Sequence, residues 1–203
     1  MPNNEPGFRL AYAISFLFHP FVVVMPLFLI VSLQFASNAI EAIIWWLLIV
    51  AGVSAAPFAF IRRGVVKGKL ADHDISKREQ RLVPFLYTIG CMAISLALLL
   101  ALRVPVELLA TFTGMISAVA LALLVTQLAR WKISLHLIGI SGAVLTLGLL
   151  VSAWYFSLTP LIALVGWARW RVKAHTPTQA AAGVFLASVV TIAVCILYGL
   201  GGS

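Results

Sequence analysis

The stretch ARWRVKAHTPTQ, at positions 168–179, places His175 six residues after Arg169 and four residues before Gln179. An imidazole can attack a phosphoryl group if another residue holds its second ring nitrogen. Gln179 follows His175 by four residues, so on a helix that begins near Thr176 its side chain can reach back to the ring. The guanidinium of Arg169 is a group that makes planar, bidentate contacts with anions such as carboxylate and phosphate.

A second histidine ends the polar stretch KISLH, at positions 132–136. An imidazole such as that of His136 can act as a general acid and as a general base. Ser134 can donate a hydrogen bond to phosphate, and Lys132 adds a positive charge. Positive charge arranged in this way stabilises the transition state of phosphoryl transfer. We therefore expect neither a metal nor another cofactor.

The first of these stretches resembles the third signature of the type-2 phosphatidic acid phosphatase superfamily. That signature is Ser-Arg-x5-His-x3-Asp, often followed by small residues. The chain matches it at Arg169 and His175 and continues with AAG, but it has Ala168 for the serine and Gln179 for the aspartate.

The other two signatures of the family are matched less completely. KISLH resembles Pro-Ser-Gly-His at Ser134 and His136, with Ile133 and Leu135 at the other two positions. SKREQRLVPF echoes Lys-x6-Arg-Pro with the same residue types at another spacing, namely Lys77, Arg78, Arg81 and Pro84. Two hydrophobic segments separate this echo from KISLH, whereas the family's common arrangement has both signatures in one loop.

The resemblance implies a lipid phosphate phosphatase within an all-α transmembrane bundle. Its substrate would be a phosphate monoester of a membrane lipid, of the phosphatidic acid, phosphatidylglycerophosphate or polyprenyl (di)phosphate class. His175 would form a phosphohistidine, with Gln179 orienting it and His136 acting as general acid and base. The implied phosphate-binding residues are Arg169, Ser134, Lys132, Lys77, Arg78 and Arg81.

Gln179 leaves a second hypothesis open. An amide oxygen can accept the N–H of His175 but brings no negative charge, and exchange of a triad aspartate for an amide removes most of the rate in other enzymes. The chain would then be a catalytically degenerate relative that binds lipid phosphate without turnover. In a third interpretation, Arg169, Arg171 and Lys173 are interfacial anchors that fix the topology.

Other classes of function fit the sequence less well. A metal-dependent prenyl or phosphatidyl transferase would need acidic residues at helical spacing, which Asp72 and Asp74 do not have. His19, inside the first hydrophobic segment, is interpreted as a packed, hydrogen-bonded residue. A transporter would need charged groups along its path, and the hydrophobic segments contain almost none. No basic tract interleaved with aromatic residues indicates a nucleic-acid partner.

The elements that must position these residues are hydrophobic segments. The chain of 203 residues is 63% hydrophobic, only 10% charged and has a mean hydropathy of +1.09, which excludes a soluble domain. Runs of about 18 or more apolar residues indicate transmembrane helices. The sequence predicts a single integral membrane domain over 1–203, all-α and polytopic, with six or seven spans. The predicted segments are 10–34, 39–61, 83–103, 106–129, 137–154, 157–170 and 180–200.

The topology has to bring His136 and His175 to the same face, so residues 137–170 must cross the bilayer and return. If all segments cross, Arg103 alone lies on the opposite side, which leaves 13 of the 14 Lys and Arg on the side of the site. This asymmetry is typical of a cytoplasmic face. We therefore expect a multi-pass protein of the cell (inner) membrane, with lipids as partners and the site facing the cytoplasm. The oligomeric state is left open.

Overall fold

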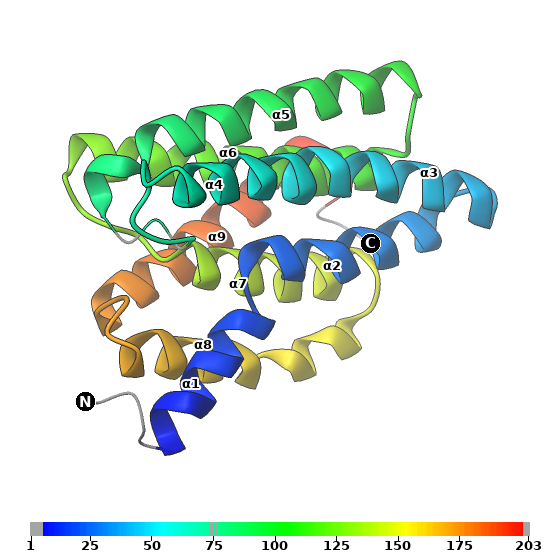
Figure 1. Ribbon diagram of the computed structural model, residues 1–203. Helices are drawn as coiled ribbons and strands as arrows, with labels where there is room; N and C mark the ends of the chain where they lie inside the picture. Colours follow the sequence, from blue (N-terminus) through cyan, green and yellow to red (C-terminus); the bar gives the residue numbers. More distant parts are fainter. Residues whose placement is uncertain (1–5, 74, 76, 201–203) are drawn as a thin grey trace.

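A computed structural model describes residues 6–73, 75 and 77–200, which form helices and no strand (Figure 1). The helices are α1 (Pro6–Leu17), α2 (Pro20–Phe35), α3 (Ala39–Val50), α4 (Ala56–Val66), α5 (Leu82–Ala101), α6 (Val106–Leu128), α7 (Leu135–Leu150), α8 (Pro160–Arg171) and α9 (Pro177–Leu197). The π-helical turn η2 (Ala51–Ala55) joins α3 to α4, and the short 3-10 helices are η3 (Arg78–Gln80) and η4 (Ala153–Leu158). The all-helical prediction is therefore confirmed for the described residues.

Four helices among the described residues are long and apolar enough to cross a membrane. They are the continuous run Ala39–Val66 and the helices α5, α6 and α9. α1 and α2 would make a fifth span if they are counted together. α7 is apolar but has 16 residues and α8 has 12, which is short for a hydrocarbon core of about 30 Å. Several membrane-length helices are thus present, as the composition predicts.

The first predicted segment, 10–34, differs from the structure because α1 and α2 meet at a bend of 46°. Pro20 has no N–H to donate and disfavours a helical conformation at the residue before it. His19 is accordingly extended, with φ −60° and ψ 140°, and its side chain caps α2 by accepting the Phe21 N–H. The break gives α1 a direction of its own, and it packs against α8.

α7 is the central helix of the bundle. It packs against α2, α8, α9 and η4, and 10 of its 16 residues are buried. A helix with most of its residues buried needs close approach by its neighbours. Gly183 of α9 provides such an approach, since a Cβ built there would lie 2.8 Å from the carbonyl oxygen of Ser134 and 3.1 Å from Cβ of Leu137.

The chain turns so that one end of the bundle collects the polar loops. The ends of α6 and α8 and the beginnings of α7 and α9 lie together, on the left in Figure 1. The loop between α5 and α6, which carries Arg103, lies at the opposite end. The path through α7, η4 and α8 therefore returns to the end from which it started, as a shared site requires.

We expect Gly183→Ala to destabilise the protein, because the new methyl group meets backbone of α7 that cannot move aside. Overpacking of this kind costs about 1–3 kcal/mol, so the melting temperature in detergent should fall by several degrees. Gly90→Ala is the matched control, since Gly90 is exposed on α5 and its Cβ would meet no atom within 4 Å. Equal melting temperatures for the two variants would contradict the close α7–α9 contact.

Candidate functional site

Five basic side chains gather at this end of the bundle and form what we call the basic cluster: Arg81, Lys132, His136, Arg169 and His175. The Arg81 guanidinium donates to the Ile133 carbonyl oxygen at 3.5 Å, and Lys132 donates to the Ala174 carbonyl oxygen at 3.1 Å. These two contacts join the beginning of α5, the α6–α7 loop and the α8–α9 loop. All members except Lys132 are buried.

His175 is oriented by Gln179. Its Nδ1 lies 3.1 Å from Oε1 of Gln179, and the same oxygen accepts the Thr176 N–H at 3.3 Å. The Thr176 side chain accepts the Gln179 N–H, which completes a capping box at the start of α9. Because the amide oxygen can only accept, Nδ1 of the neutral ring carries the proton and Nε2 keeps its lone pair. The expected contact between positions 175 and 179 is therefore present in the structure.

The environment keeps His175 neutral. Burial, and after it the positive charges of Lys132, Arg169 and Arg81, together lower its pKa from 6.5 to about 3, against the opposing effect of the Gln179 hydrogen bond. At neutral pH the imidazole is therefore uncharged. A neutral imidazole with an available Nε2 is the form that can act as a nucleophile.

His136 has two neighbours that require opposite protonation of the same nitrogen. Its Nε2 lies 3.1 Å from the Ser15 carbonyl oxygen and 3.4 Å from Nη1 of Arg169. A carbonyl only accepts and a guanidinium only donates, so protonated Nε2 donates to Ser15 and deprotonated Nε2 accepts from Arg169. Both protonation states of this nitrogen thus have a partner in place.

The carbonyl of Ser15 can face His136 because α1 ends there. In a continuous helix the His19 N–H would bind the Ser15 carbonyl oxygen, but it binds the Phe16 carbonyl oxygen instead, at 3.2 Å. The helix break described above therefore supplies one of the contacts of the basic cluster.

His19 also lies against this cluster, although its sequence context indicated only a packed residue. Its ring centroid is 5.2 Å from that of His136, in an edge-to-face arrangement. Its Nδ1 accepts the Phe21 N–H at 3.3 Å, so His19 is hydrogen-bonded as predicted. A histidine before a proline at a helix break was the available signal, whereas no sequence pattern connects Ser15 to position 136.

Ser134 is fully buried beside these groups, and its Oγ has no hydrogen-bond partner among the described residues. Its backbone N–H donates to the Gln179 carbonyl oxygen at 3.4 Å, which fixes the start of α7 against the start of α9. A buried hydroxyl group without a partner is costly, so Ser134 is a donor that a ligand could satisfy.

Of the basic residues in SKREQRLVPF, the stretch that echoes the first family signature, the structure brings one into the basic cluster. Arg81 joins the basic cluster although α5 and α6 lie between it and KISLH in the sequence. Lys77 is exposed, and within the described part of the chain no contact connects it to the cluster. The position of Arg78 is known as the first residue of η3, but its side chain lies outside the described structure.

His73 lies in the loop between α4 and α5, with Asp72 before it in the sequence. The His73 ring stacks on Phe58 at a centroid distance of 6.0 Å. Asp74 lies outside the described residues. Among the residues that are described, no group of three or more His, Cys, Asp and Glu could hold a metal ion. The His73 ring therefore contacts Phe58 of α4.

A pocket of about 400 Å³ opens over His175. Its wall is formed by Lys132, Trp170, Lys173, Ala174, His175, Thr176, Pro177 and Gln179. The pocket therefore combines the uncharged imidazole with two ammonium groups and an aromatic side chain. His136 does not line it, and Arg169 is the residue that connects His136 with the His175 side of the cluster.

The lowered pKa of His175 makes a prediction for stability. Between pH 6.5 and about 3 the unfolded chain binds a proton that the folded chain excludes, so stability falls as the pH falls. The contribution of one such group is at most about 1.4 kcal/mol per pH unit, and it vanishes above pH 6.5. His175→Asn should therefore lose less stability than the unchanged protein between pH 7 and pH 4, as measured by thermal unfolding in detergent.

The matched control is His73→Asn, at an exposed position in the loop between α4 and α5. This variant should lose as much stability on acidification as the unchanged protein. If the His175→Asn variant and the unchanged protein lose stability equally on acidification, the imidazole is not held neutral in the folded state.

Comparison with models of protein families, with curated proteins and with solved structures finds no match to this chain. The geometry of the basic cluster and of its pocket is thus the basis on which a function can be assigned.

Proposed function

We propose that this chain is a metal-independent lipid phosphate phosphatase, a divergent member of the type-2 phosphatidic acid phosphatase superfamily. The observation that carries the proposal is His175, a neutral imidazole oriented by Gln179 and open to a pocket with cationic walls. The substrate is a phosphate monoester of a membrane lipid, of the phosphatidic acid, phosphatidylglycerophosphate or polyprenyl (di)phosphate class. Such an imidazole among fixed positive charges suits attack on an anionic phosphoryl group.

In the proposed reaction, Nε2 of His175 attacks phosphorus and the bond to the lipid oxygen breaks. His136 gives the Nε2 proton to the leaving oxygen and then accepts a contact from Arg169, for which the geometry is already present. Water then attacks the phosphohistidine, His136 takes a proton from it, and phosphate leaves. Arg169, Lys132 and Arg81 stabilise the charge on the phosphoryl oxygens, and Ser134 donates a further hydrogen bond.

The membrane setting supports a lipid substrate. Three exposed tryptophans, Trp131, Trp167 and Trp170, lie near the basic end, where aromatic side chains commonly mark the membrane–water boundary. A pocket at that depth meets the headgroup of a lipid. We propose six or seven spans in the cell (inner) membrane, with this end in the cytoplasm because the Lys and Arg residues concentrate there.

A second candidate function is phosphate binding without turnover, and two observations favour it. Oε1 of Gln179 is shared with the Thr176 N–H and carries no formal charge, so it would stabilise an imidazolium less than a carboxylate. His136 lies outside the wall of the pocket and its Nε2 faces the Ser15 carbonyl. Substrate binding would have to rearrange Arg169 before His136 could reach a leaving group.

The activity is tested by phosphate release from phosphatidic acid vesicles in excess EDTA. His175→Ala removes the nucleophile and should reduce turnover to background, and His136→Ala should reduce it by about 10²–10⁴-fold. Lys69→Ala, which removes an exposed positive charge from the loop before α5, should leave the rate unchanged. Full activity in both histidine variants would end the proposal.

Gln179→Asp separates the two candidates. A carboxylate at this position would stabilise the imidazolium that develops on His175, so a working phosphatase should gain at least about tenfold in kcat. If neither the unchanged protein nor Gln179→Asp releases phosphate, while both bind phosphatidic acid vesicles more tightly than vesicles of neutral lipid, binding without turnover is the correct function.

A further inference from the structure

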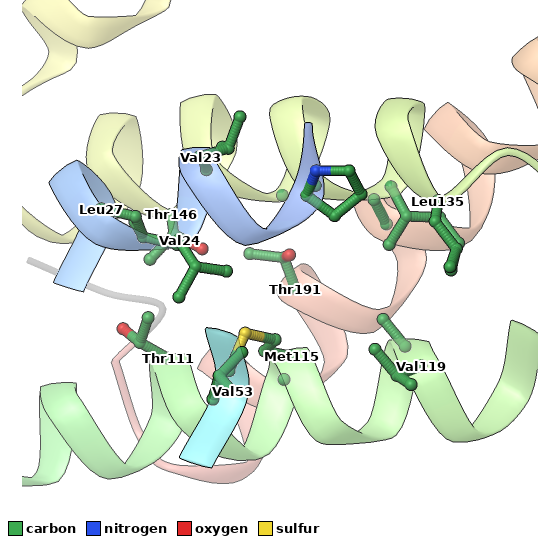
Figure 2. A pocket seen from close by; sticks show the side chains of 18 of the residues that line it. Val23, Val24, Leu27, Val53, Thr111, Met115, Val119, Leu135, Thr146 and Thr191 are labelled. Atoms are coloured by element: carbon green, nitrogen blue, oxygen red, sulfur yellow. The ribbon is translucent and has the colours of Figure 1, made fainter. Parts of the chain in front are cut away.

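A second cavity lies inside the bundle, away from the polar pocket. It has a volume of about 130 Å³ and lies between α2, α5, α6, α7 and α9. Figure 2 shows Val24 and Leu27 of α2 facing Met115 and Val119 of α6 across it. A cavity of similar volume with apolar walls is known to stay free of water and to take an apolar guest. This cavity therefore favours a hydrocarbon.

The cavity wall carries four threonine hydroxyl groups, and two of them are bonded within their own helices. Thr88 donates to the Pro84 carbonyl oxygen and Thr111 to the Glu107 carbonyl oxygen, each at 2.8 Å within its own helix. Their hydrogen bonds are therefore satisfied without a ligand. An apolar guest would leave neither of them without a partner.

The residues that line the cavity follow α7 over most of its length. Along α7 its lining residues extend from Leu135 to Leu150. At a rise of 1.5 Å per residue this corresponds to about 22 Å, close to the length of the whole helix. A small volume spread over such a length suits an extended chain better than a compact molecule.

One end of the cavity adjoins the basic cluster. Leu135 lies between Ser134 and His136, and Pro20 follows His19, whose ring contacts His136. A third lining residue, Phe85, is one helical turn after Arg81. The cavity thus begins within one helical turn, along the sequence, of the residues proposed to bind phosphate.

We infer that this cavity holds the hydrocarbon tail of the lipid whose phosphate binds at the basic cluster. The inference rests on the proposed function, because the polar end of the ligand is taken from it. The tail would run along α7 from the basic end towards the opposite end of the bundle. The protein would then draw one lipid tail out of the bilayer into its interior, and would distinguish its ligands by tail length and shape.

Gly142→Leu is the variant that tests the cavity. Gly142 lines it from α7, and a Cβ added there meets no atom within 4 Å, so the new side chain occupies the cavity without striking the backbone. Gly90→Leu is the matched control, because Gly90 is exposed on α5 and its Cβ is equally free of contacts. If Gly142→Leu does not fold, Ala118→Met fills the same space from α6.

The experiment is photo-crosslinking with phosphatidic acid that carries a diazirine on its tail, in vesicles of neutral lipid. The labelled peptides should come from the cavity walls of α6, α7 and α9. Labelling of these peptides should fall at least fivefold in Gly142→Leu and stay unchanged in Gly90→Leu. It should also persist in His175→Ala, because the readout is binding and needs no turnover.

The outcomes separate the tail site from the phosphatase activity. Cavity labelling without phosphate release would remove the activity and leave the tail site in place. Labels confined to the lipid-facing surfaces of the helices, or equal in Gly142→Leu and Gly90→Leu, would overturn the tail site whatever the activity. Equal labelling by a tail probe without a phosphate would overturn the link between this cavity and the basic cluster.

Discussion

The site depends on the burial of α7 and on the return of the chain along α8. α7 begins at Leu135, within the polar stretch, and 10 of its 16 residues are buried among α2, α8, α9 and η4. α8 runs back to the same end, where Arg169 reaches His136 across 33 positions of sequence. Because α7 is packed against α2, α8 and α9 and the His136 side chain is buried, packing fixes the position of His136, and the remaining groups are arranged around it.

This arrangement concentrates positive charge where little water reaches. Arg81 and Arg169 are both almost fully buried, and His175 lies between the charges of Arg81, Arg169 and Lys132. Buried guanidinium groups require partners, and backbone carbonyl oxygens provide some of them for Arg81. The same burial and the same neighbouring charges lower the pKa of His175, so its imidazole stays neutral. One physical cause, the proximity of cations at low polarity, thus accounts both for the concentrated positive charge and for the neutral imidazole.

The sequence predicted the parts of this arrangement that are local or periodic. Apolar runs gave the helices, and a four-residue spacing on a capped helix gave the contact between His175 and Gln179. The bend before Pro20 was missed because the apolar pattern continues through it and hides the effect of the proline. The sequence named Arg81 only through an echo of a family signature at another spacing, because its approach to the cluster depends on where α5 and α6 return. The cavity depends on side-chain volumes from five helices. Neither leaves a signal at a fixed spacing.

The partner of His136 on α1 is a main-chain oxygen, and this changes what evolution has to preserve. Substitution of the serine would alter a side chain while the carbonyl stayed where it is. The contact is determined instead by the place where the first helix stops, which Pro20 sets from five positions away. A relative of this protein could therefore differ at residue 15 and keep the same hydrogen-bond acceptor for His136, provided that it retained the proline.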